Sequence, residues 1–396
     1  MYKEFSVHTQ IYFGEHALDR LSNMGAKRAM LICDPFVVTS GLVRHVTDRF
    51  DRAGVVYSVY SDVVPDPPIE KVVVGVKAAL ECNPDCMVAI GGGSAMDLSK
   101  AIRKMAPAMQ PDFFPRLIAI PTTSGTGSEV TSFAVITDSA AGTKYPLVAD
   151  DMTPDEAILD EELVKSVPPA ITADTGMDVM THAIESYVSI NNNEFSAALA
   201  EKAIEICGQF LLRSYADNRD SHARRKMHIA SCLAGLAFNA SSLGLNHGMA
   251  HQLGAQFHIP HGRANAMLLP HIIEFNSESD KHSRSKQAYP PCVRKYCVVA
   301  RTRGLQNLNE VTTIRALTGY MEFMNKEMGI PLSISEMGVV SEGEYMSRVE
   351  AMAEAALADA CTATNPRYPT KEEIAEIYRK LWLQRKQSKI GFLARV

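Results

Sequence analysis

The fold of the N-terminal part of this chain is decided by the stretch CMVAIGGGS at residues 86–94. Apolar residues lead directly into three glycines and a serine, and an amphipathic stretch over residues 95–105 follows. This order predicts a buried strand, a tight turn and a helix. The first turn of such a helix offers unpaired N–H groups, which favour binding of a phosphate group. A capped turn without a ligand, with Ser94 and Asp97 as the capping pair, is the alternative interpretation.

The same alternation of short apolar runs and amphipathic stretches extends on both sides of this turn. The sequence predicts further strands over residues 29–33, 55–60 and 117–121, and helices over residues 42–53 and 69–81. Alternating strands and helices are typical of a parallel sheet that is covered on both faces. We therefore expect a Rossmann-like α/β domain over residues 1–167.

The pattern changes at the adjacent residues Pro168 and Pro169. From there on, apolar residues recur at spacings of three and four, which is the period of helices. Helices are predicted over residues 177–189, 197–215, 224–239, 314–328, 344–357 and 371–383. Because proline cannot continue a helix, we place a domain boundary at this pair and expect an all-helical domain over residues 168–396.

Composition narrows the class of protein. The 396 residues are 46% hydrophobic, which is enough for a large core, and the net charge of −5 comes from interspersed charges of both signs. A nucleic-acid partner is therefore not expected. The N-terminus is polar and lacks the pattern of a signal peptide. The eight cysteines are scattered, which suits free thiols in a reducing cytosol.

One segment could be mistaken for a membrane span. Residues 227–262 contain no Lys, Arg, Asp or Glu, and residues 229–245 are largely apolar. The segment also contains Asn239, Ser241, Asn246 and several histidines. We therefore expect a buried core helix that leads into a polar site, and no membrane partner.

A second loop follows the strand predicted over residues 117–121. Residues 121–129, PTTSGTGSE, place hydroxyl groups and glycines in one turn, which suits an anion or a ribose. We call it the hydroxyl loop. Ligands of open α/β sheets bind at the carboxyl ends of the strands, so two such loops favour a nucleotide site over a flexible Ser/Gly loop.

Asp34 directly follows the strand predicted over residues 29–33. A carboxylate at that position can bind the ribose hydroxyls of NAD. It would also repel a 2′-phosphate, because two like charges about 5 Å apart at an effective dielectric constant of about 20 repel by about 3 kcal/mol. That is roughly a hundredfold preference for NAD over NADP. A turn or helix-capping role is the alternative interpretation.

Acidic and imidazole side chains form a candidate metal site in the C-terminal half. Asp178 and His182 are four residues apart, so on a helix they lie on one face, one turn apart. His247, His251 and His261 follow within one short stretch. A carboxylate with three imidazoles suits Fe²⁺, Zn²⁺ or Ni²⁺ better than Mg²⁺ or Ca²⁺.

These motifs together resemble one family. The matching stretches are GGGSAMD (residues 91–97), PTTSGTGSEVT (121–131), TGMDVMTHAIESY (175–187), NHGMAHQLG (246–254) and IPHGRANAMLLP (259–270). Over almost its whole length the chain is similar to the group III, iron-dependent alcohol dehydrogenases, and in finer detail to the 1-propanol dehydrogenases of bacterial microcompartments. The resemblance implies a dehydroquinate synthase-like fold, with a Rossmann-like NAD-binding domain, an all-helical metal-binding domain and an active site in the cleft between them.

The resemblance also implies roles for individual residues. The implied metal ligands are Asp178, His182, His247 and His261, and His251 is the implied proton relay. The implied cofactor contacts are Asp34, Asp66, Gly92, Gly93, Ser94, Thr122, Thr123, Thr131, Val135 and Lys144. The implied cofactors are NAD and Fe²⁺, with Zn²⁺ as the alternative metal. A homo-oligomer, dimeric or larger, is expected, either in the cytoplasm or inside a microcompartment with shell or cargo proteins as partners.

These features predict that the protein reduces a short aldehyde with NADH, while the metal polarises the carbonyl group. The apolar residues Phe133, Phe238 and Leu243 would favour a short apolar substrate. A lyase of the dehydroquinate synthase type is an alternative, but it needs cations that residues 227–262 lack. A reductase for a polar aldehyde, such as sulfoacetaldehyde or lactaldehyde, is another alternative. The intact ligand set argues against a scaffold protein. The segment over residues 277–303 and the tail after Leu383 depart from the family pattern, which bears on surface partners.

Overall fold

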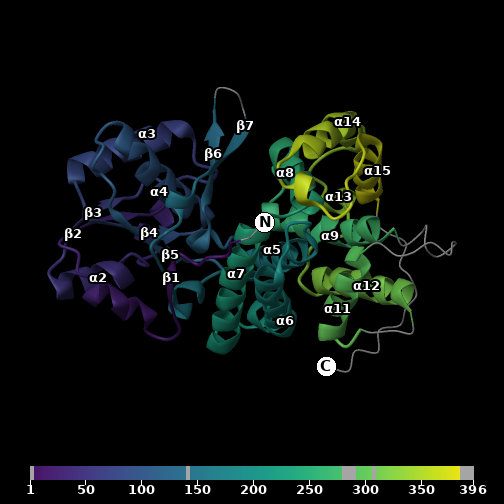
Figure 1. Cartoon of the computed structure of the whole chain (residues 1–396), viewed down its shortest axis with the longest axis horizontal. Coiled ribbons are helices and arrows are strands. Elements are labelled where there is room, and N and C mark those ends of the chain that lie inside the picture. Colours follow the sequence, from purple (N-terminus) through teal and green to yellow (C-terminus); the bar gives the residue numbers. More distant parts are fainter. Residues whose placement is uncertain (1–3, 140–142, 279–290, 306–308, 384–396) are drawn as a thin grey trace. The chain divides into compact units, whose positions relative to one another are not determined.

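The computed structural model describes residues 4–139, 143–278, 291–305 and 309–383 (Figure 1). The chain divides into two compact units. The sheet unit comprises Met1–Val167 and Asn218–Asn239, and the helical unit comprises Pro168–Asp217 and Ala240–Val396. Residues 218–239 thus group with the sheet unit, although the sequence pattern placed them in the helical domain. Residues 279–290 of the atypical segment over 277–303, and the tail over 384–396, lie outside the described residues.

A parallel sheet of six strands, in the order β1-β8-β5-β4-β2-β3, forms the centre of the sheet unit. The strands are β1 (Gln10–Phe13), β2 (Arg28–Ile32), β3 (Val56–Tyr60), β4 (Cys86–Gly91), β5 (Arg116–Pro121) and β8 (Glu156–Leu159). Within this register Gly91 at the end of β4 pairs with Pro121 at the end of β5. The glycine turn and the hydroxyl loop therefore leave the same edge of the sheet from neighbouring strands.

Helices cover both faces of the sheet, as the alternating pattern predicted (Figure 1). Helices α3 (Ile69–Cys82) and α4 (Gly93–Met105) pack on one face, and α2 (Arg44–Ala53) packs on the other. Strand β4 shows why its sequence is continuously apolar. Met87 and Ala89 point into the core cluster beneath α3 and α4, whereas Val88 and Ile90 point into the cluster beneath α2. A strand buried on both faces has no position for a polar side chain.

Shorter elements complete the sheet unit. An antiparallel pair, β6 (Phe133–Asp138) and β7 (Thr143–Val148), follows the hydroxyl loop. A short helix, α1 (Pro35–Thr39), follows β2, and most of helix α7 (Ser221–Ser241) belongs to this unit. The sequence pattern missed β1 and β8 because four-residue strands are too short to show a clear period.

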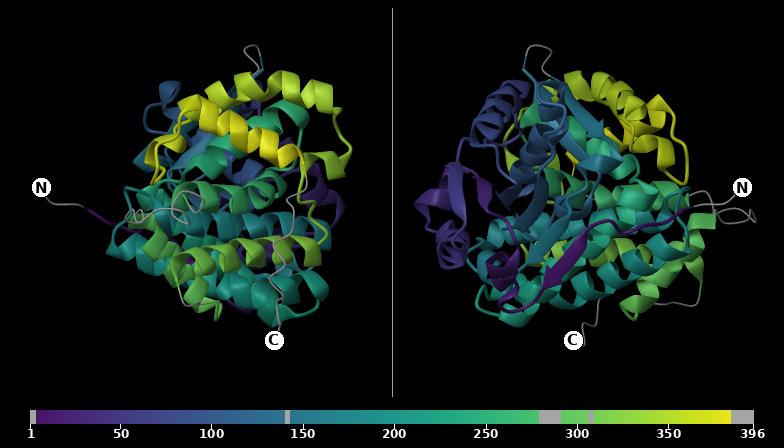
Figure 2. Two further views of the ribbon diagram at one scale, coloured as in Figure 1. Left: turned by 90° about the vertical axis from the view of Figure 1, so that its right-hand side faces the viewer. Right: turned by 60° about the vertical axis from the view of Figure 1, so that its left-hand side comes forward.

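The helical unit contains no strand among its described residues. Its helices are α5 (Pro169–Val188), α6 (Glu194–Ala216), α8 (Leu245–Phe257), α9 (His261–Ser277), α11 (Pro291–Thr302), α12 (Glu310–Glu327), α13 (Ile334–Met337), α14 (Glu342–Ala358) and α15 (Lys371–Trp382). Helix α5 packs against α6 and α9, and α9 also packs against α8 and α12 (Figure 2). The double proline begins α5, because Pro169 occupies the first turn, where its missing N–H group costs no hydrogen bond.

No single described helix is long and apolar enough to cross a membrane. Helices α7 and α8 meet that criterion only jointly, as a bent pair. All eight cysteines lie among the described residues and are free thiols.

Candidate metal centre and dinucleotide site

Three helices of the helical unit bring the four predicted metal ligands together. Asp178 and His182 lie one turn apart on α5, His247 lies in the first turn of α8, and His261 begins α9. Oδ1 of Asp178 is 3.9 Å from Nε2 of His182, 3.7 Å from Nε2 of His247 and 3.6 Å from Nε2 of His261. One potential ligand atom from each of the four residues lies within 4.8 Å of the others. The four side chains therefore have the spacing that a single ion requires.

The amide of Asn265 shows that this arrangement suits a cation. Its Nδ2 donates to Oδ1 of Asp178 at 2.7 Å and lies 3.1 Å from Nε2 of both His247 and His261. One carboxylate oxygen and two ring nitrogens thus converge on one amide nitrogen, which has only two hydrogens to offer. Asn246 fixes this amide by donating to its Oδ1 at 2.8 Å. A divalent ion could bind all three atoms together once the rings are neutral, since metal binding displaces protons, and the donor set of one carboxylate and three imidazoles fits Fe²⁺ or Zn²⁺.

Glu185 orients one of the imidazoles. It lies on the same face of α5 as Asp178, and its Oε2 pairs with Nδ1 of His247. Its Oε1 accepts the backbone N–H of Asn246 at 2.7 Å. A Cβ at Gly244 would lie 2.7 Å from that Oε1, so only glycine leaves room for the carboxylate. The ring of His247 is held through Nδ1, so its Nε2 faces Asp178. Histidine ligands of metals are commonly held in this way, by a carboxylate on the other ring nitrogen.

The buried charges of this cluster stabilise one another. Burial alone would lower the pKa of His247, but the carboxylates of Glu185 and Asp178 raise it to about 9. Burial alone would raise the pKa of Asp178, but the facing imidazoles of His182, His261 and His247 hold it below its ordinary value. The carboxylate therefore remains ionised, which is the form that binds a metal.

His251, the predicted proton relay, lies one turn after His247 on α8. Its ring stacks on that of His261, with a centroid distance of 5.4 Å. Its Nδ1 is 2.8 Å from Oδ2 of Asp359, at the end of α14. Asp359 is held in turn by the backbone N–H of Cys361, which donates to Oδ1 at 2.9 Å.

The sequence pattern missed Glu185, Asn265 and Asp359. Glu185 and Asn265 each follow a predicted ligand by one turn of a helix, Glu185 after His182 and Asn265 after His261, so helical spacing could have pointed to them. Asp359 lies more than a hundred residues from His251, and no local pattern marks it.

The glycine turn at the end of β4 begins α4 in the sheet unit. Gly91 has φ of 153°, and a Cβ there would lie 2.7 Å from the Cβ of Ala95. Gly92 is the N-cap of α4, which makes the helix begin two residues earlier than the sequence pattern predicted. The capping pair of Ser94 and Asp97, which was the alternative interpretation, does not form. Asp97 instead accepts hydrogen bonds from Ser128 in the hydroxyl loop and from Val135 after it.

The hydroxyl loop lies against this turn. The backbone N–H of Thr122 donates to the carbonyl of Gly91 at 2.8 Å. A Cβ at Gly92 would lie 3.5 Å from Oγ1 of Thr123. The predicted cofactor residues of the two loops are therefore neighbours in space.

Asp34 combines its two predicted roles. Its Oδ1 accepts the backbone N–H of Val37 at 3.0 Å and caps α1. Its Oδ2 lies 3.6 Å from where a Cβ of Gly91 would lie. One carboxylate oxygen is thus used in the cap, and the other faces the glycine turn.

The remaining predicted cofactor residues differ in exposure. Asp66 is exposed after β3 with φ of 48°. Thr131 is fully buried, and its hydroxyl accepts a hydrogen bond from Lys100. The backbone N–H of Val135 donates to Asp97. Lys144 pairs with Thr137 across β6 and β7, and its side chain lies outside the described residues. Cofactor contacts at these positions stay predictions.

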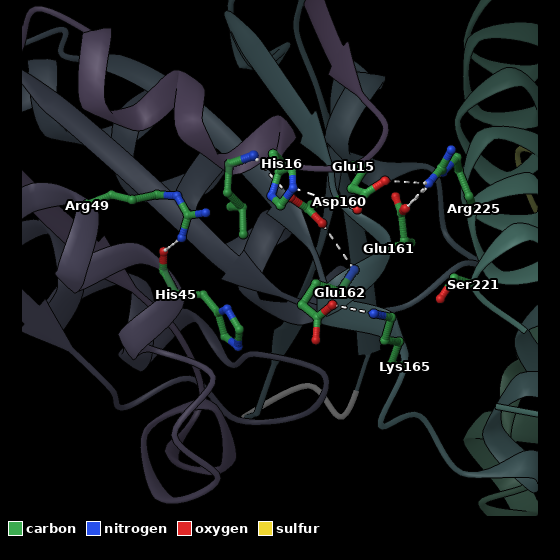
Figure 3. A pocket seen from close by; sticks show the side chains of 11 residues that line it. Glu15, His16, His45, Arg49, Asp160, Glu161, Glu162, Lys165, Ser221 and Arg225 are labelled. Carbon is green, nitrogen blue, oxygen red and sulfur yellow. Dashed lines mark hydrogen bonds and ion pairs between the residues drawn. The ribbon is translucent and has the colours of Figure 1, made fainter. Parts of the chain in front are cut away.

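A separate pocket of about 270 Å³ lies in the sheet unit beyond the ends of β1 and β8 (Figure 3). Its lining is strongly charged: Glu15, His16, Leu18, His45, Arg49, Asp160, Glu161, Glu162, Lys165, Ser221 and Arg225. Arg225 pairs with Glu161, and Lys165 pairs with Glu162. Arg49, the remaining cation, pairs with Asp19. Because each cation of the lining is paired with a carboxylate and no predicted site residue lines the pocket, we interpret it as a structural cavity.

Two family models match the chain. A model described as iron-containing alcohol dehydrogenase matches residues 8–161, and one described as the C-terminal part of the Fe-containing alcohol dehydrogenase family matches residues 172–382. The first match covers the sheet with its two loops, and the second covers the cluster of Asp178, His182, His247 and His261.

Known proteins resemble the chain nearly from end to end. A 1-propanol dehydrogenase of Citrobacter freundii is 42% identical over 385 residues, which are 96% of this chain and 100% of that protein. An NADPH-dependent butanol dehydrogenase of Clostridium saccharobutylicum is 38% identical, covering 94% of this chain and 96% of that protein. The crystal structure of a sulfoacetaldehyde reductase from Bifidobacterium kashiwanohense in complex with NAD⁺ matches with a TM-score of 0.83 at 28% identity, over 96% of this chain and 99% of that one. The predicted fold class is thereby confirmed.

Proposed function

This chain belongs to the iron-containing alcohol dehydrogenase family, and from that premise we propose that it interconverts a short-chain aldehyde and its primary alcohol with NAD(H). Propionaldehyde and acetaldehyde are the proposed substrates. The single observation that carries the proposal is the convergence of Asp178, His182, His247 and His261 on one point of the helical unit. Family membership favours an oxidoreductase over a dehydroquinate synthase-type lyase.

The proposed metal ligands are those four residues, with Fe²⁺ as the proposed ion and Zn²⁺ as the alternative. A bound divalent ion would supply Lewis-acid chemistry, which polarises a carbonyl oxygen and stabilises negative charge that develops on it. Glu185 would keep His247 oriented for the ion, and Asn265 would have to release the lone pairs that it now occupies. The side chains of Asp178, His182 and His247 are at most 6% exposed, whereas that of His261 is 43% exposed. His261 is therefore the proposed ligand that is most open to solvent.

NAD(H) is the proposed dinucleotide, bound at the glycine turn and the hydroxyl loop. The N-terminus of α4, at Gly93, favours a pyrophosphate because no side chain caps its first turn. The carboxylate of Asp34 beside Gly91 supports NAD over NADP, since it would repel a 2′-phosphate. Similar proteins are divided on this point, because one butanol dehydrogenase is named NADPH-dependent and one sulfoacetaldehyde reductase binds NAD⁺.

His251 is the proposed source of the proton that the alkoxide receives. Asp359 holds its Nδ1, so the ring presents Nε2 as the atom that can exchange a proton with substrate or water. A carboxylate in this position fixes the orientation and tautomer of the ring, as in other Asp–His pairs.

A short apolar substrate is supported by the neighbouring sequence. No Lys, Arg, Asp or Glu occurs between residues 227 and 262, which include His247 and His251. Arg263, the next cation, is paired through two hydrogen bonds of 3.1 Å with Asp174. An anionic aldehyde such as sulfoacetaldehyde would need an unpaired cation, so we rank that alternative second.

The deciding experiment measures aldehyde-dependent oxidation of NADH by protein purified without oxygen and loaded with Fe²⁺. Aldehydes of two to four carbons and sulfoacetaldehyde are compared, each with NADH and with NADPH. We expect turnover with the apolar aldehydes, and its loss after chelation or in His247→Ala. The exposed-residue variant His8→Ala is the matched control and should retain activity. Turnover by metal-free protein would overturn the proposal.

Assembly into a homo-oligomer and packaging in a bacterial microcompartment are proposed on the resemblance alone. Light scattering of the purified protein measures its mass, and co-purification with shell or cargo proteins from the native organism checks the packaging. A monomer, or a protein found only free in the cytoplasm, would contradict these two proposals without affecting the chemistry.

A further inference from the structure

A buried lysine ties the hydroxyl loop to helix α4. Lys100 is fully buried in the sheet unit. Its Nζ donates to Oγ of Ser128 at 2.8 Å, to Oγ1 of Thr131 at 3.0 Å and to the carbonyl of Phe133 at 2.9 Å. An ammonium group has three hydrogens, so every donor of this side chain is used. All three acceptors lie at the end of the hydroxyl loop or in the residues that follow it.

Asp97, one turn earlier on the same helix, binds the same segment. Its Oδ1 accepts the hydroxyl of Ser128 at 2.7 Å, and its Oδ2 accepts the backbone N–H of Val135 at 3.0 Å. The hydroxyl of Ser128 therefore accepts from Lys100 and donates to Asp97. Lys100 and Asp97, two opposite charges on α4, therefore both bind the segment over residues 128–135.

The other end of the hydroxyl loop is fixed to the glycine turn. Thr122 donates its backbone N–H to Gly91 at 2.8 Å, and a Cβ at Gly93 would lie 3.0 Å from Cγ2 of Thr126. The loop therefore rests on the N-terminus of α4, while Lys100, two turns further along that helix, fixes the loop's exit. Helix α4 therefore sets the distance between the cofactor residues predicted at the glycine turn and those predicted in and after the hydroxyl loop.

Stability alone does not explain a charged group at this position. Taking an ammonium out of water is costly, and apolar side chains of similar volume often replace buried ion pairs without loss of stability. Burial lowers the pKa of Lys100 to about 8, which reflects this cost. A set of three directed hydrogen bonds instead defines the loop's position, which an apolar contact cannot do.

We infer that Lys100 is a positioning residue for the dinucleotide, holding the hydroxyl loop in register with the glycine turn. The inference rests on the proposed function of these two loops. Because its side chain is fully buried and its donors are used, Lys100 acts through the loop and does not itself contact the cofactor. Its loss would displace the loop's exit, with the predicted cofactor residues Thr131 and Val135, relative to the glycine turn.

The test is the Kd for NADH, measured by the fluorescence of bound NADH in Lys100→Met and in the wild-type protein. A displacement of about 1 Å weakens such contacts strongly, so we expect the Kd to rise roughly tenfold or more. The KM for NADH should rise likewise, while the iron content and the KM for the aldehyde stay unchanged. Lys104→Met is the matched control, since Lys104 lies on the same helix but is exposed and pairs with Asp151.

Two further variants keep the test decisive if Lys100→Met does not fold. Ser128→Ala removes one acceptor at a position that is not a predicted cofactor contact, and Thr131→Ser keeps the hydroxyl acceptor; the Kd for NADH should rise by a smaller factor in the first variant and stay unchanged in the second. A wild-type Kd in folded Lys100→Met, or in Ser128→Ala, overturns the inference. If the wild-type protein binds neither NADH nor NADPH, the proposed function fails, and this inference fails with it.

Discussion

Oε2 of Glu185 holds Nδ1 of His247, and this contact orients a ligand of the proposed metal from a position two turns along the helix that carries Asp178. Glu185→Gln would keep the shape but lose the charge that fixes the ring. We expect the affinity for Fe²⁺ or Zn²⁺ to fall by roughly 10- to 100-fold, as for other partners of histidine ligands. Competition with a chelator measures this affinity, and the exposed-residue variant Glu194→Gln is the control. Unchanged affinity in a folded Glu185→Gln protein would show that the contact only supports the fold.

The carboxylate of Asp34 should set the choice between NAD and NADP. Asp34→Asn keeps an oxygen to cap α1 but removes the charge, so rejection of NADPH should weaken by up to roughly a hundredfold. Asp34→Ala removes both and should also lose about 1 kcal/mol of stability with the cap. The ratio of kcat/KM for NADH to that for NADPH is the measurement. An unchanged ratio in Asp34→Asn would place the selectivity elsewhere.

The pair of His251 and Asp359 should act as a unit. His251→Ala removes the proposed proton donor, and we expect kcat for aldehyde reduction to fall by about 100-fold or more. Asp359→Asn should also lower kcat, because an amide does not fix the tautomer of the ring as a carboxylate does. In the double variant the second change should add little, since both act on the same step. Fully additive losses, measured at equal iron content, would contradict this coupling.

The buried ring of His228 should make stability depend on pH. It lies in the sheet unit, 3.0 Å from Oγ of Ser124, and burial lowers its pKa from 6.5 to about 4. Between these two values the unfolded chain binds a proton that the folded chain does not. Stability is therefore complete above pH 6.5 and falls by about 3 kcal/mol as the pH drops to 4.

His228→Gln should remove this component. The measurement is the free energy of unfolding by urea, for both proteins at pH 7.5 and at pH 4.5. The wild-type protein should lose more stability on acidification than the variant does. Equal losses would mean that His228 is protonated in the folded protein, contrary to its burial.

Local patterns predicted most long elements well, for identifiable reasons. The strand at residues 86–90 is apolar throughout because it is buried on both faces, and Gly91 must follow it because no Cβ fits beside Ala95. Strand β8 escaped prediction because its four residues begin with a glutamate. Glu156 is buried in a salt bridge with Arg20, a partner that only the folded chain supplies.

The sequence by itself determined the alternation that builds the sheet and, through spacing and resemblance, the proposed ligand set of Asp178, His182, His247 and His261. These features are local, because a period or a spacing of four residues is set within one element. Only the tertiary structure decided which atoms meet: that Asp359 holds His251, and that the charge of Lys100 is used inside the protein. Such contacts join residues far apart in the chain, and packing of whole elements, rather than any local preference, brings them together.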